Sequence, residues 1–398
     1  MIENRDFIIV GLQPWDIAIG SNCKNIATEL SKKNRVLYVN TPLDRITSIR
    51  DKHLPEVQKR KAVIAGKENG LIKVSDNLWT LYPSFITESI NKLPAGWLYN
   101  LLNKRNNKRF AREIKKILGQ LGFKNVILFN DSLMFQGFYL KELLDPALAI
   151  YYIRDNLVTQ PYFKKHGEAM EPALAAKYDV VVSNSDYLAQ CLRPSNSKSF
   201  MIGQGCDFTL FDFARVLPGK PDDLKDIPSP VIGYVGFLTG MRLDIKLLEY
   251  LATNRKKYSF VLVGPEDEEF KASALHHYPN IYFLGAKSEG ELVQYVNAFD
   301  VCINPQLNNG MTIGNYPRKI DEYLAMGKPT VATKNETMAF FKEHVYLSEG
   351  YQHYATHLDE ALQTDTEQKK QARIAFARGH TWANSVSKLY EVIEKENK

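Results

Sequence analysis

Short apolar runs alternate along the first half of the chain with segments in which apolar residues recur at helical spacing. The runs predict buried strands at residues 7–12, 35–39, 126–129, 149–153 and 180–182. One helix is predicted between the first two runs, through Ile26, Ala27 and Leu30, and a longer one over residues 97–121. Because strand, helix and strand follow in this order, the pattern predicts right-handed parallel units of an α/β fold.

The same alternation starts again in the second half, after a proline-rich stretch. Residues 217–230, LPGKPDDLKDIPSP, hold four prolines in fourteen residues and predict a linker. Further strands are predicted at residues 231–235, 260–263, 281–284, 301–303 and 330–332. A chain of 398 residues suits two domains of about 200 residues each. We therefore expect two doubly wound, Rossmann-like α/β domains, residues 1–216 and residues 231–379.

Polar residues directly follow several of these predicted strands. Asp131, Asp155 and Ser185 come just after three of the runs in the first half. Because the carboxyl ends of parallel strands meet at one edge of a sheet, we expect these side chains to converge. Ser185 also suits the N-cap of a helix. For Asp155 we expect a catalytic role at this edge; the alternative is an ion pair with a neighbour of Arg154.

The composition narrows the class of protein. Hydrophobic residues make up 44% of the chain and charged residues 24%, which is typical of a soluble globular protein. No apolar run approaches the roughly 20 residues needed to span a bilayer, so a cytoplasmic protein is expected. The four cysteines form no C-x-x-C pair, and the eight histidines offer no convincing set of metal ligands. We therefore expect no metal and no bound cofactor.

Charge is unevenly shared between the two halves. Residues 1–200 hold 29 Lys and Arg against 19 Asp and Glu, a net +10, whereas residues 201–398 hold 22 against 26, a net −4. Seven of the basic residues lie on the predicted long helix between Lys104 and Lys116, opposed by Glu113 alone. Such a face is either solvated or in contact with anionic lipid, and both interpretations stay open. No motif of a nucleic-acid-binding module is present, so nucleic acid is not expected as a partner.

The most informative segment comprises residues 301–333. Its pattern predicts a strand, an Asn- and Gly-rich loop, a short helix that begins at Pro317, and another strand. Arg318 and Lys319 place two cations at the start of this helix, where the dipole and unpaired N–H groups favour an anion. The arrangement therefore predicts a phosphate site. Glu322, one turn later, would accept hydrogen bonds from ribose hydroxyls; the alternative is an ordinary ion pair with Lys319.

A second candidate for phosphate binding follows the first strand of the second domain. Residues 233–242, GYVGFLTGMR, join that strand to the next helix. Their glycines allow backbone N–H groups to approach a diphosphate closely. Taken alone, such a loop is more often a turn than a phosphate site.

The order of Pro317, Lys319, Glu322-Tyr-Leu-Ala and Gly327-Lys-Pro resembles the signature of nucleotide-sugar glycosyltransferases with the two-domain GT-B fold, especially those that build bacterial polysaccharides. The resemblance implies that Lys319 contacts the donor diphosphate and that Glu322 holds the donor ribose. It also implies two Rossmann-like domains that face a cleft, with the acceptor mainly on the first domain.

Other segments of the second half resemble further parts of this family. Residues 281–287 resemble the segment that contacts the donor base, and residues 308–315 resemble the loop that contacts the donor sugar. Residues 380–398 resemble the terminal helix, which crosses back to pack on the first domain. The positions that the resemblance thereby assigns to donor binding are Gly285, Ala286, Asn309, Gly310 and Gly314.

The chain also departs from the family's pattern. Phe237 follows Gly236 where the family has an arginine, while Arg242, six residues after that glycine, stands in the place of a lysine. Gly314 stands where many retaining members have a glutamate, so retention of stereochemistry does not follow from the resemblance. We expect Gly236 and Phe237 to border the donor, and Arg242 and Lys319 to stabilise the leaving diphosphate.

The resemblance implies a hexosyltransferase-like glycosyltransferase that works without a metal. It would move a sugar from a nucleoside-diphosphate sugar to a glycan or lipid-linked acceptor of the cell envelope or of an exopolysaccharide. Residues 104–116 would bring it to the inner face of the cell membrane as a peripheral protein. Two alternatives stay open: a GT-B sugar-nucleotide epimerase, and a catalytically silent partner that binds a sugar nucleotide.

Overall fold

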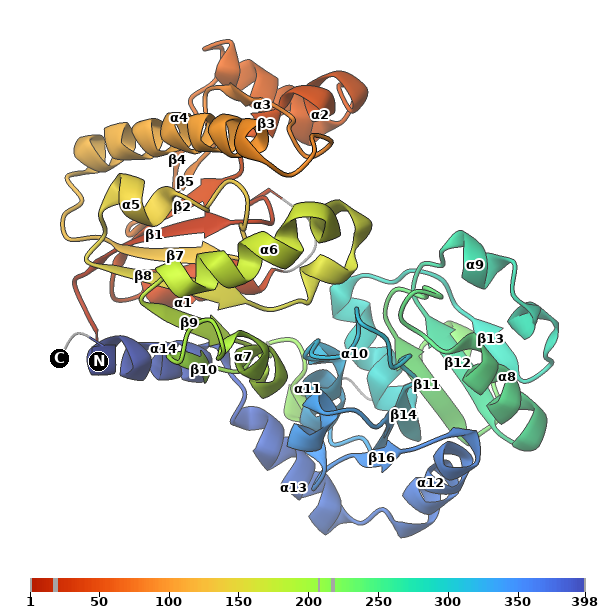
Figure 1. The fold of residues 1–398 in the computed structure, drawn as a ribbon. Coiled ribbons are helices and arrows are strands. Elements are labelled where there is room, and N and C mark those ends of the chain that lie inside the picture. The colour runs from red at the N-terminus through yellow and green to blue at the C-terminus, as the bar shows by residue number, and fades with distance from the viewer. Residues whose placement is uncertain (1, 17–20, 207, 216–218, 397–398) are drawn as a thin grey trace. The chain divides into compact units, whose positions relative to one another are not determined.

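Two compact units make up the chain (Figure 1). The computed structural model describes residues 2–16, 21–206, 208–215 and 219–396. The first unit comprises Met1–Gly203 and Ser385–Lys398, and the second comprises Gln204–Asn384. The predicted linker, residues 217–230, falls within the range of the second unit, and its residues 217 and 218 lie outside the described residues.

The first unit is built around an eight-stranded sheet in the order β10-β9-β8-β7-β1-β2-β5-β4. Neighbouring strands run parallel except β4 and β5, which are antiparallel. The strands are β1 (Asp6–Gly11), β2 (Arg35–Asn40), β4 (Leu71–Ser75), β5 (Leu78–Leu81), β7 (Ile127–Asp131), β8 (Leu148–Ile153), β9 (Val180–Ser183) and β10 (Ser199–Met201), with a separate small sheet of β3 (Leu43–Asp44) and β6 (Ile86–Thr87). All five strands predicted for this half are present, each within two residues of its predicted ends.

The register of this sheet brings polar residues to its carboxyl edge. Gly11 at the end of β1 pairs with Asp131 at the end of β7, and Ile153 of β8 pairs with Ser183 of β9. The predicted convergence of these strand ends is therefore confirmed. The chain order of the strands reverses between β1 and β7, which is the position where open α/β sheets bind ligands.

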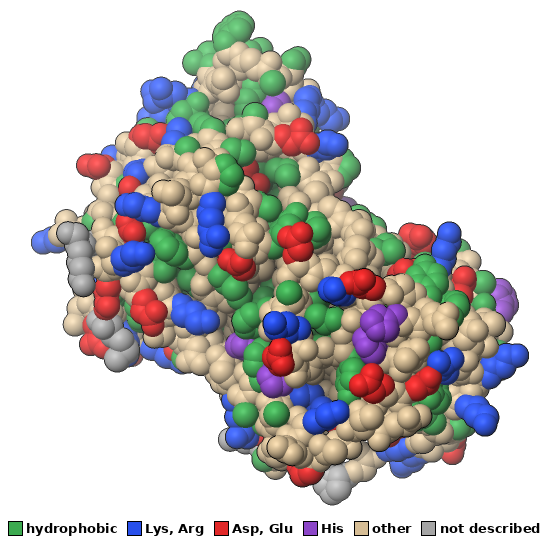
Figure 2. Space-filling model, turned by 60° about the horizontal axis from the view of Figure 1, so that its bottom comes forward, with side chains coloured by type: hydrophobic (Ala, Val, Ile, Leu, Met, Phe, Trp, Pro, Cys, Tyr) green, Lys and Arg blue, Asp and Glu red, His purple; other side chains and the backbone are tan. Residues whose placement is uncertain are grey.

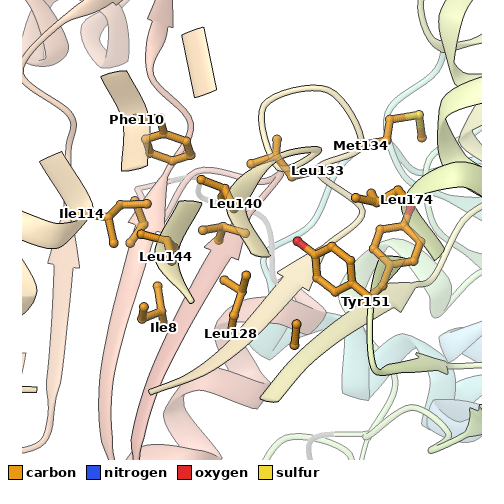
Figure 3. Close-up of a cluster of buried hydrophobic side chains, with 14 of the residues drawn as sticks. Ile8, Phe110, Ile114, Leu128, Leu133, Met134, Leu140, Leu144, Tyr151 and Leu174 are labelled. Atoms are coloured by element: carbon orange, nitrogen blue, oxygen red, sulfur yellow. The ribbon is translucent and has the colours of Figure 1, made fainter. Parts of the chain in front are cut away.

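Helices cover both faces of the first sheet (Figure 1). They are α1 (Asn22–Ser31), α2 (Arg45–Arg50), α3 (Pro55–Ile64), α4 (Trp97–Leu121), α5 (Leu140–Leu144), α6 (Pro161–Lys177) and α7 (Asp186–Leu192), with the 3₁₀ turn η1 (Leu157–Thr159). The long α4 has the predicted bounds, and Figure 3 shows its Phe110 and Ile114 in one buried cluster with Ile8 and Leu128 of the sheet. A fully buried apolar side chain contributes about 1.5–3 kcal/mol, so this face holds the helix in place.

The last helix, α14 (Trp382–Glu396), packs on the first unit through its residues from 385 onwards. Asn34 Nδ2 donates a hydrogen bond to the hydroxyl of Tyr390 at 2.8 Å, and Lys198 forms an ion pair with Glu396 at 2.5 Å. The C-terminal segment therefore belongs to the first unit, although the residues directly before it belong to the second.

The second unit holds a six-stranded, wholly parallel sheet in the order β13-β12-β11-β14-β15-β16. Its strands are β11 (Val231–Val235), β12 (Ser259–Val263), β13 (Ile281–Phe283), β14 (Val301–Asn304), β15 (Thr330–Thr333) and β16 (Tyr346–Ser348). In chain order this is 3-2-1-4-5-6, the order of a doubly wound Rossmann sheet. The predicted fold class, with two Rossmann-like α/β units, is confirmed.

The helices of the second unit are α8 (Ile245–Asn254), α9 (Glu268–Lys271), α10 (Glu289–Ala298), α11 (Arg318–Ala325), α12 (Tyr351–Thr364) and α13 (Glu367–Arg378), with the 3₁₀ turns η2 (Phe213–Arg215), η3 (Asp222–Leu224), η4 (Ala274–His277) and η5 (Thr337–Phe341). In the part of the chain that the structure describes, no helix of either unit is both long enough and apolar enough to cross a bilayer.

Candidate functional site

The reversal of strand order in the second sheet lies between β11 and β14, so the loops after these two strands are side by side. The backbone N–H of Leu307, after β14, donates to the carbonyl of Arg242, after β11, at 2.8 Å. The N–H of Asp244 donates in the same way to the carbonyl of Pro305 at 2.9 Å. Two segments about 60 residues apart in the sequence thus form one connected surface at the carboxyl edge of the sheet.

The glycine loop after β11 also contacts the loop after β12. The N–H of Gly236 donates to the carbonyl of Val263 at 2.9 Å, and the N–H of Gly264 donates to the carbonyl of Gly285 at 2.9 Å. Gly236 and Gly264 have φ angles of 152° and 150°, which L side chains rarely adopt. A Cβ on Gly264 would lie 1.8 Å from the carbonyl oxygen of Gly236. Gly264 therefore lets the two loops touch, and Gly285, predicted to contact the donor base, lies directly beside them.

We expect Gly264→Ala to displace the loop at Gly236, because the new methyl group overlaps the carbonyl oxygen of Gly236. Overpacking of this kind lowers the free energy of unfolding by about 1–3 kcal/mol. Binding of a nucleoside diphosphate should weaken about tenfold or more if the loop supplies N–H groups to phosphate. Calorimetric titration and thermal melts measure both effects.

Gly290→Ala is the matched control for that substitution, since Gly290 lies on α10 with open space around its Cβ position. It should leave nucleotide binding unchanged. Its only expected effect on melting is a stabilisation of the helix by about 1 kcal/mol. If Gly264→Ala melts and binds as the control does, the contact between the two loops has no role in the site.

Two predicted site residues, Phe237 and Arg242, project from the loop after β11. The side chain of Phe237 is 54% exposed, and Arg242 is exposed as well. Beneath them lies Tyr234, which is buried; its hydroxyl would be 2.7 Å from a Cβ on Gly236. Burial raises the pKa of Tyr234 to about 12; the charge of Arg242 opposes this shift and that of Glu322 adds to it. Arg242, in the loop after β11, and Glu322, on the helix α11 (Arg318–Ala325), thus both affect the pKa of this hydroxyl.

The helix α11 carries the second set of candidate residues. Glu322 is 2% exposed, and its carboxylate accepts from Arg318 Nε at 2.9 Å and from Lys319 Nζ at 2.8 Å. The pair of Lys319 with Glu322, which the sequence left as an alternative, is therefore present in the structure. Pro317 precedes the helix as its N-cap rather than forming its first residue, so the predicted start was one residue early.

Several contacts fix α11 beside the sheet. The hydroxyl of Tyr323 accepts from the N–H of Val235 at 3.0 Å, which joins the helix to the end of β11. On the neighbouring face, Asp321 is fully buried and is bound by the Tyr316 hydroxyl and by His380 Nδ1, both at 2.8 Å. Burial raises the pKa of Asp321, while hydrogen bonds from these two partners oppose the shift. The helix start is thus held rigidly at the carboxyl edge.

The loop after β14 is shaped by Asn309. Its Oδ1 accepts from the N–H groups of Met311 and Thr312, both at 3.0 Å, and its Nδ2 donates to the carbonyl of Met241 at 3.0 Å. The side chain therefore holds the loop closed and ties it to the loop after β11. Gly310 and Gly314, the other predicted donor-sugar residues, lie on this same loop, and Ala286 is exposed after Gly285.

Asp155, the third predicted catalytic residue, lies in the first unit. Arg154 Nε donates to Asp131 Oδ1 at 2.8 Å, and Arg154 Nη1 donates to Asp155 Oδ2 at 3.2 Å. The sequence placed these residues at one edge correctly, and Asp155 forms an ion pair with the adjacent Arg154. Ser185 caps α7 through its hydroxyl, as predicted.

The site residues that sequence reasoning missed are Tyr234, Gly264 and Tyr323. Gly264 directly follows the apolar run of β12, so a glycine at a strand end was a usable signal. The two tyrosines carry no such signal. From the sequence alone each is expected to be an ordinary core residue, and only the structure shows what its hydroxyl contacts. Among the described residues, no group of three or more His, Cys, Asp and Glu is placed to hold a metal ion.

Comparison with protein families gives a match for part of the chain. Residues 229–362 match the family described as "Glycosyl transferases group 1". TuaH of Bacillus subtilis (strain 168), a proposed teichuronic acid biosynthesis glycosyltransferase, is 26% identical over 200 residues. That match covers 48% of this chain and 50% of TuaH, so the chain matches about half the length of this relative.

Comparison with solved structures covers nearly the whole chain. Anabaena HepE, in a complex with UDP and glucose, superposes with a TM-score of 0.65 over 98% of this chain and all of that one, at 15% identity. A sucrose-phosphate synthase from Thermosynechococcus elongatus gives a TM-score of 0.65 at 14% identity, over 98% and 99% of the two chains. The chain therefore has the GT-B fold, as its sequence indicated, and the part of its second unit from residue 229 to residue 362 matches the group 1 glycosyl transferase family.

Proposed function

We propose that this protein transfers a sugar from a nucleoside-diphosphate sugar to a glycan or lipid-linked acceptor of the cell envelope or of an exopolysaccharide. The observation that carries the proposal is the start of α11, where Arg318 and Lys319 converge on the buried carboxylate of Glu322 beside the glycine loop after β11. A diphosphate would take the cations, and a ribose would take the carboxylate.

In this proposal the second unit performs the binding chemistry without a metal. As the bond between the anomeric carbon and the diphosphate oxygen breaks, negative charge grows on the leaving diphosphate. Arg242, Lys319 and the N–H groups of the loop at Gly236 would stabilise that charge, which is the usual way such sites accelerate transfer. Lys319 would then turn from Glu322 to phosphate, leaving the carboxylate to the ribose hydroxyls.

The relatives support the choice of the first substrates to test. HepE is described in complexes with UDP and with UDP-glucose, and TuaH is named for teichuronic acid biosynthesis. These descriptions support a uridine nucleotide as donor and an anionic envelope polymer or its lipid-linked precursor as acceptor. The basic residues 104–116 support action at the inner face of the cell membrane, where such precursors are held.

Two residues of the second unit bear on the alternatives to transfer, which are a silent sugar-nucleotide-binding partner and an epimerase. Gly314 lacks the side chain that a retaining member would present to the sugar, and Phe237 replaces a cation. Both would suit a silent partner that binds the sugar nucleotide without turning it over. An epimerase, by contrast, would alter or hydrolyse the donor with no acceptor present.

The proposal is tested by incubating the protein with a panel of nucleotide-sugars, with and without lipid extracted from bacterial membranes. We expect nucleoside diphosphate to be released from one of them and the release to require the lipid. Release of nucleoside diphosphate that does not depend on lipid indicates the epimerase. Binding of the nucleotide-sugar without such release indicates the silent partner. Either result overturns the proposed transfer.

A further inference from the structure

One face of α4 presents apolar and then basic side chains to solvent. Trp97 is 77% exposed and Leu101 is 58% exposed, which is unusual for side chains of this size. Because residues three and four apart share a helix face, the same face continues through the cations of the next turns. Those exposed cations are Lys104, Arg105, Lys108, Arg112, Lys115 and Lys116. We call these eight residues the α4 outer face.

The opposite face of α4 is the one that packs on the protein. Tyr99, Asn103, Phe110 and Ile114 are all buried, and Tyr99 stacks on the ring of His166 with a centroid distance of 3.9 Å. The side chains that anchor α4 to the protein are therefore on the opposite face. The α4 outer face is the side of the helix that faces solvent.

The short helix α2 adds two further apolar side chains beside the start of α4. Ile46 is 41% exposed and Ile49 is 67% exposed. Residues of α2 and residues of α4 together line one cavity of about 370 Å³. Arg45 of α2 forms an ion pair with Glu88 at 2.7 Å, and the N–H of Glu88 donates to Asn106 of α4 at 3.2 Å. The two helices are thus neighbours. Figure 2 shows, without identifying single elements, that exposed hydrophobic side chains with Lys and Arg around them occur at the upper end of its view.

The cations of the α4 outer face are open to solvent. Among the described residues, none of its six cations forms an ion pair with a carboxylate. Glu113, the one acidic residue of this stretch, is turned away and accepts from the N–H of Ser84 at 2.7 Å. A second copy of the chain docked face to face would bring these like charges together, which disfavours self-association as their use. Anionic lipid offers both the charge and the apolar medium.

We propose that the α4 outer face and the exposed isoleucines of α2 dock the protein on an anionic bilayer. Trp97, Leu101 and Ile49 enter the interface between headgroups and acyl chains, and the cations lie along the phosphates. If the protein transfers a sugar as proposed above, this docking also selects the class of acceptor. A protein bound to the bilayer meets an acceptor that is anchored in the bilayer. The lipid-linked acceptor is then favoured over a free glycan.

The test is co-sedimentation of the whole protein with vesicles of phosphatidylcholine alone and of phosphatidylcholine with phosphatidylglycerol in equal parts. We expect binding to the anionic vesicles. Each cation near such a surface contributes about fivefold, so changing Lys104, Arg105, Lys108 and Arg112 to Gln should weaken binding about a hundredfold or more. Trp97→Ser with Leu101→Ser should weaken it about tenfold or more at every salt concentration.

The matched control is Ile72→Ser with Val74→Ser, which removes two exposed apolar side chains from β4, 38% and 42% exposed. It should bind the vesicles as the wild type does. All variants should keep the wild-type melting temperature, because every changed side chain faces solvent. Trp97→Phe should still bind but lose part of the blue shift in fluorescence that the wild type shows with vesicles.

Two results would overturn this proposal. One is equal vesicle binding by the wild type and both α4 variants. The other is a dimer in sedimentation equilibrium that dissociates in the Trp97 and Leu101 variant, since the face would then bind a second copy. Vesicle binding is measured without donor, so a failure here leaves release of nucleoside diphosphate, and thus the proposed transfer, to be judged separately.

Discussion

Changing Arg242 and Lys319 together to Ala is expected to weaken binding of a nucleoside diphosphate by about a hundredfold or more. Each side chain would make a charge-assisted hydrogen bond to phosphate, which contributes about 1.5–3 kcal/mol, or about ten- to a hundredfold. Arg242 lies in the loop after β11 and Lys319 at the start of α11, and the backbone of Leu307, in the loop that leads to α11, bonds to Arg242. Calorimetric titration with UDP measures the loss directly.

The control for this variant is Lys256→Ala with Lys257→Ala. These exposed lysines precede β12, at the amino edge of the same sheet, so their loss changes the net charge of the unit equally but leaves the loops alone. UDP should bind this control as it binds the wild type, apart from a small effect that added salt removes. Undiminished affinity in the Arg242 and Lys319 variant would place the phosphate site elsewhere.

Changing Glu322 to Gln is expected to abolish recognition of the donor ribose. Gln keeps one acceptor but replaces the other with an NH₂ donor, so binding of the ribonucleotide should weaken by about 1.5–3 kcal/mol. Wild-type protein should prefer UDP over 2′-deoxy-UDP, and the variant should bind both alike. A wild type that does not distinguish the two, or a variant that distinguishes them equally well, would remove Glu322 from the site.

The structure adds an effect on stability to this prediction. Glu322 is buried and bound by both Arg318 and Lys319, so removing its charge leaves two cations without their partner. Breaking a buried pair costs about 3–5 kcal/mol, and the exposure of the two cations should keep the loss below that range. Asp359→Asn is the matched control, since it breaks the ion pair of Asp359 with Arg255 at 2.6 Å. It should lower the melting temperature without changing the choice between UDP and its deoxy analogue.

The sequence was most informative where local pattern and global fold agree. Every strand predicted from an apolar run is present, because a strand buried on both faces must be apolar along its length. The start of α11 was also predicted to within one residue, since Pro317 and Gly327 mark its two ends chemically. Strands such as β4 and β10 were not predicted, because β4 lies at an edge with most of its side chains exposed and β10 has three residues.

Contacts between segments far apart in the sequence could not be predicted from the sequence alone. The burial of Asp321 with His380 joins residues 59 positions apart, and the bond of Tyr323 to Val235 joins residues 88 apart. Asp155 shows a different limit: its place at the sheet edge followed from the pattern, but its pairing with the adjacent Arg154 depends on side-chain directions. The apolar start of the α4 outer face was not identified from the sequence, since the exposure of Trp97 and Leu101 is known only once the buried face of the helix is known.

Sugar transfer by this protein is measured most directly by following a labelled sugar from donor to acceptor. The protein is incubated with UDP-sugar labelled in the sugar and with bacterial membrane lipid, and the lipid fraction is counted after extraction. We expect label in the lipid fraction matched by an equal amount of released UDP, and a fall of at least about a hundredfold in both when Arg242 and Lys319 are changed to Ala. Label transfer that survives the double change, or UDP release with no label in any acceptor, would contradict the proposed transfer.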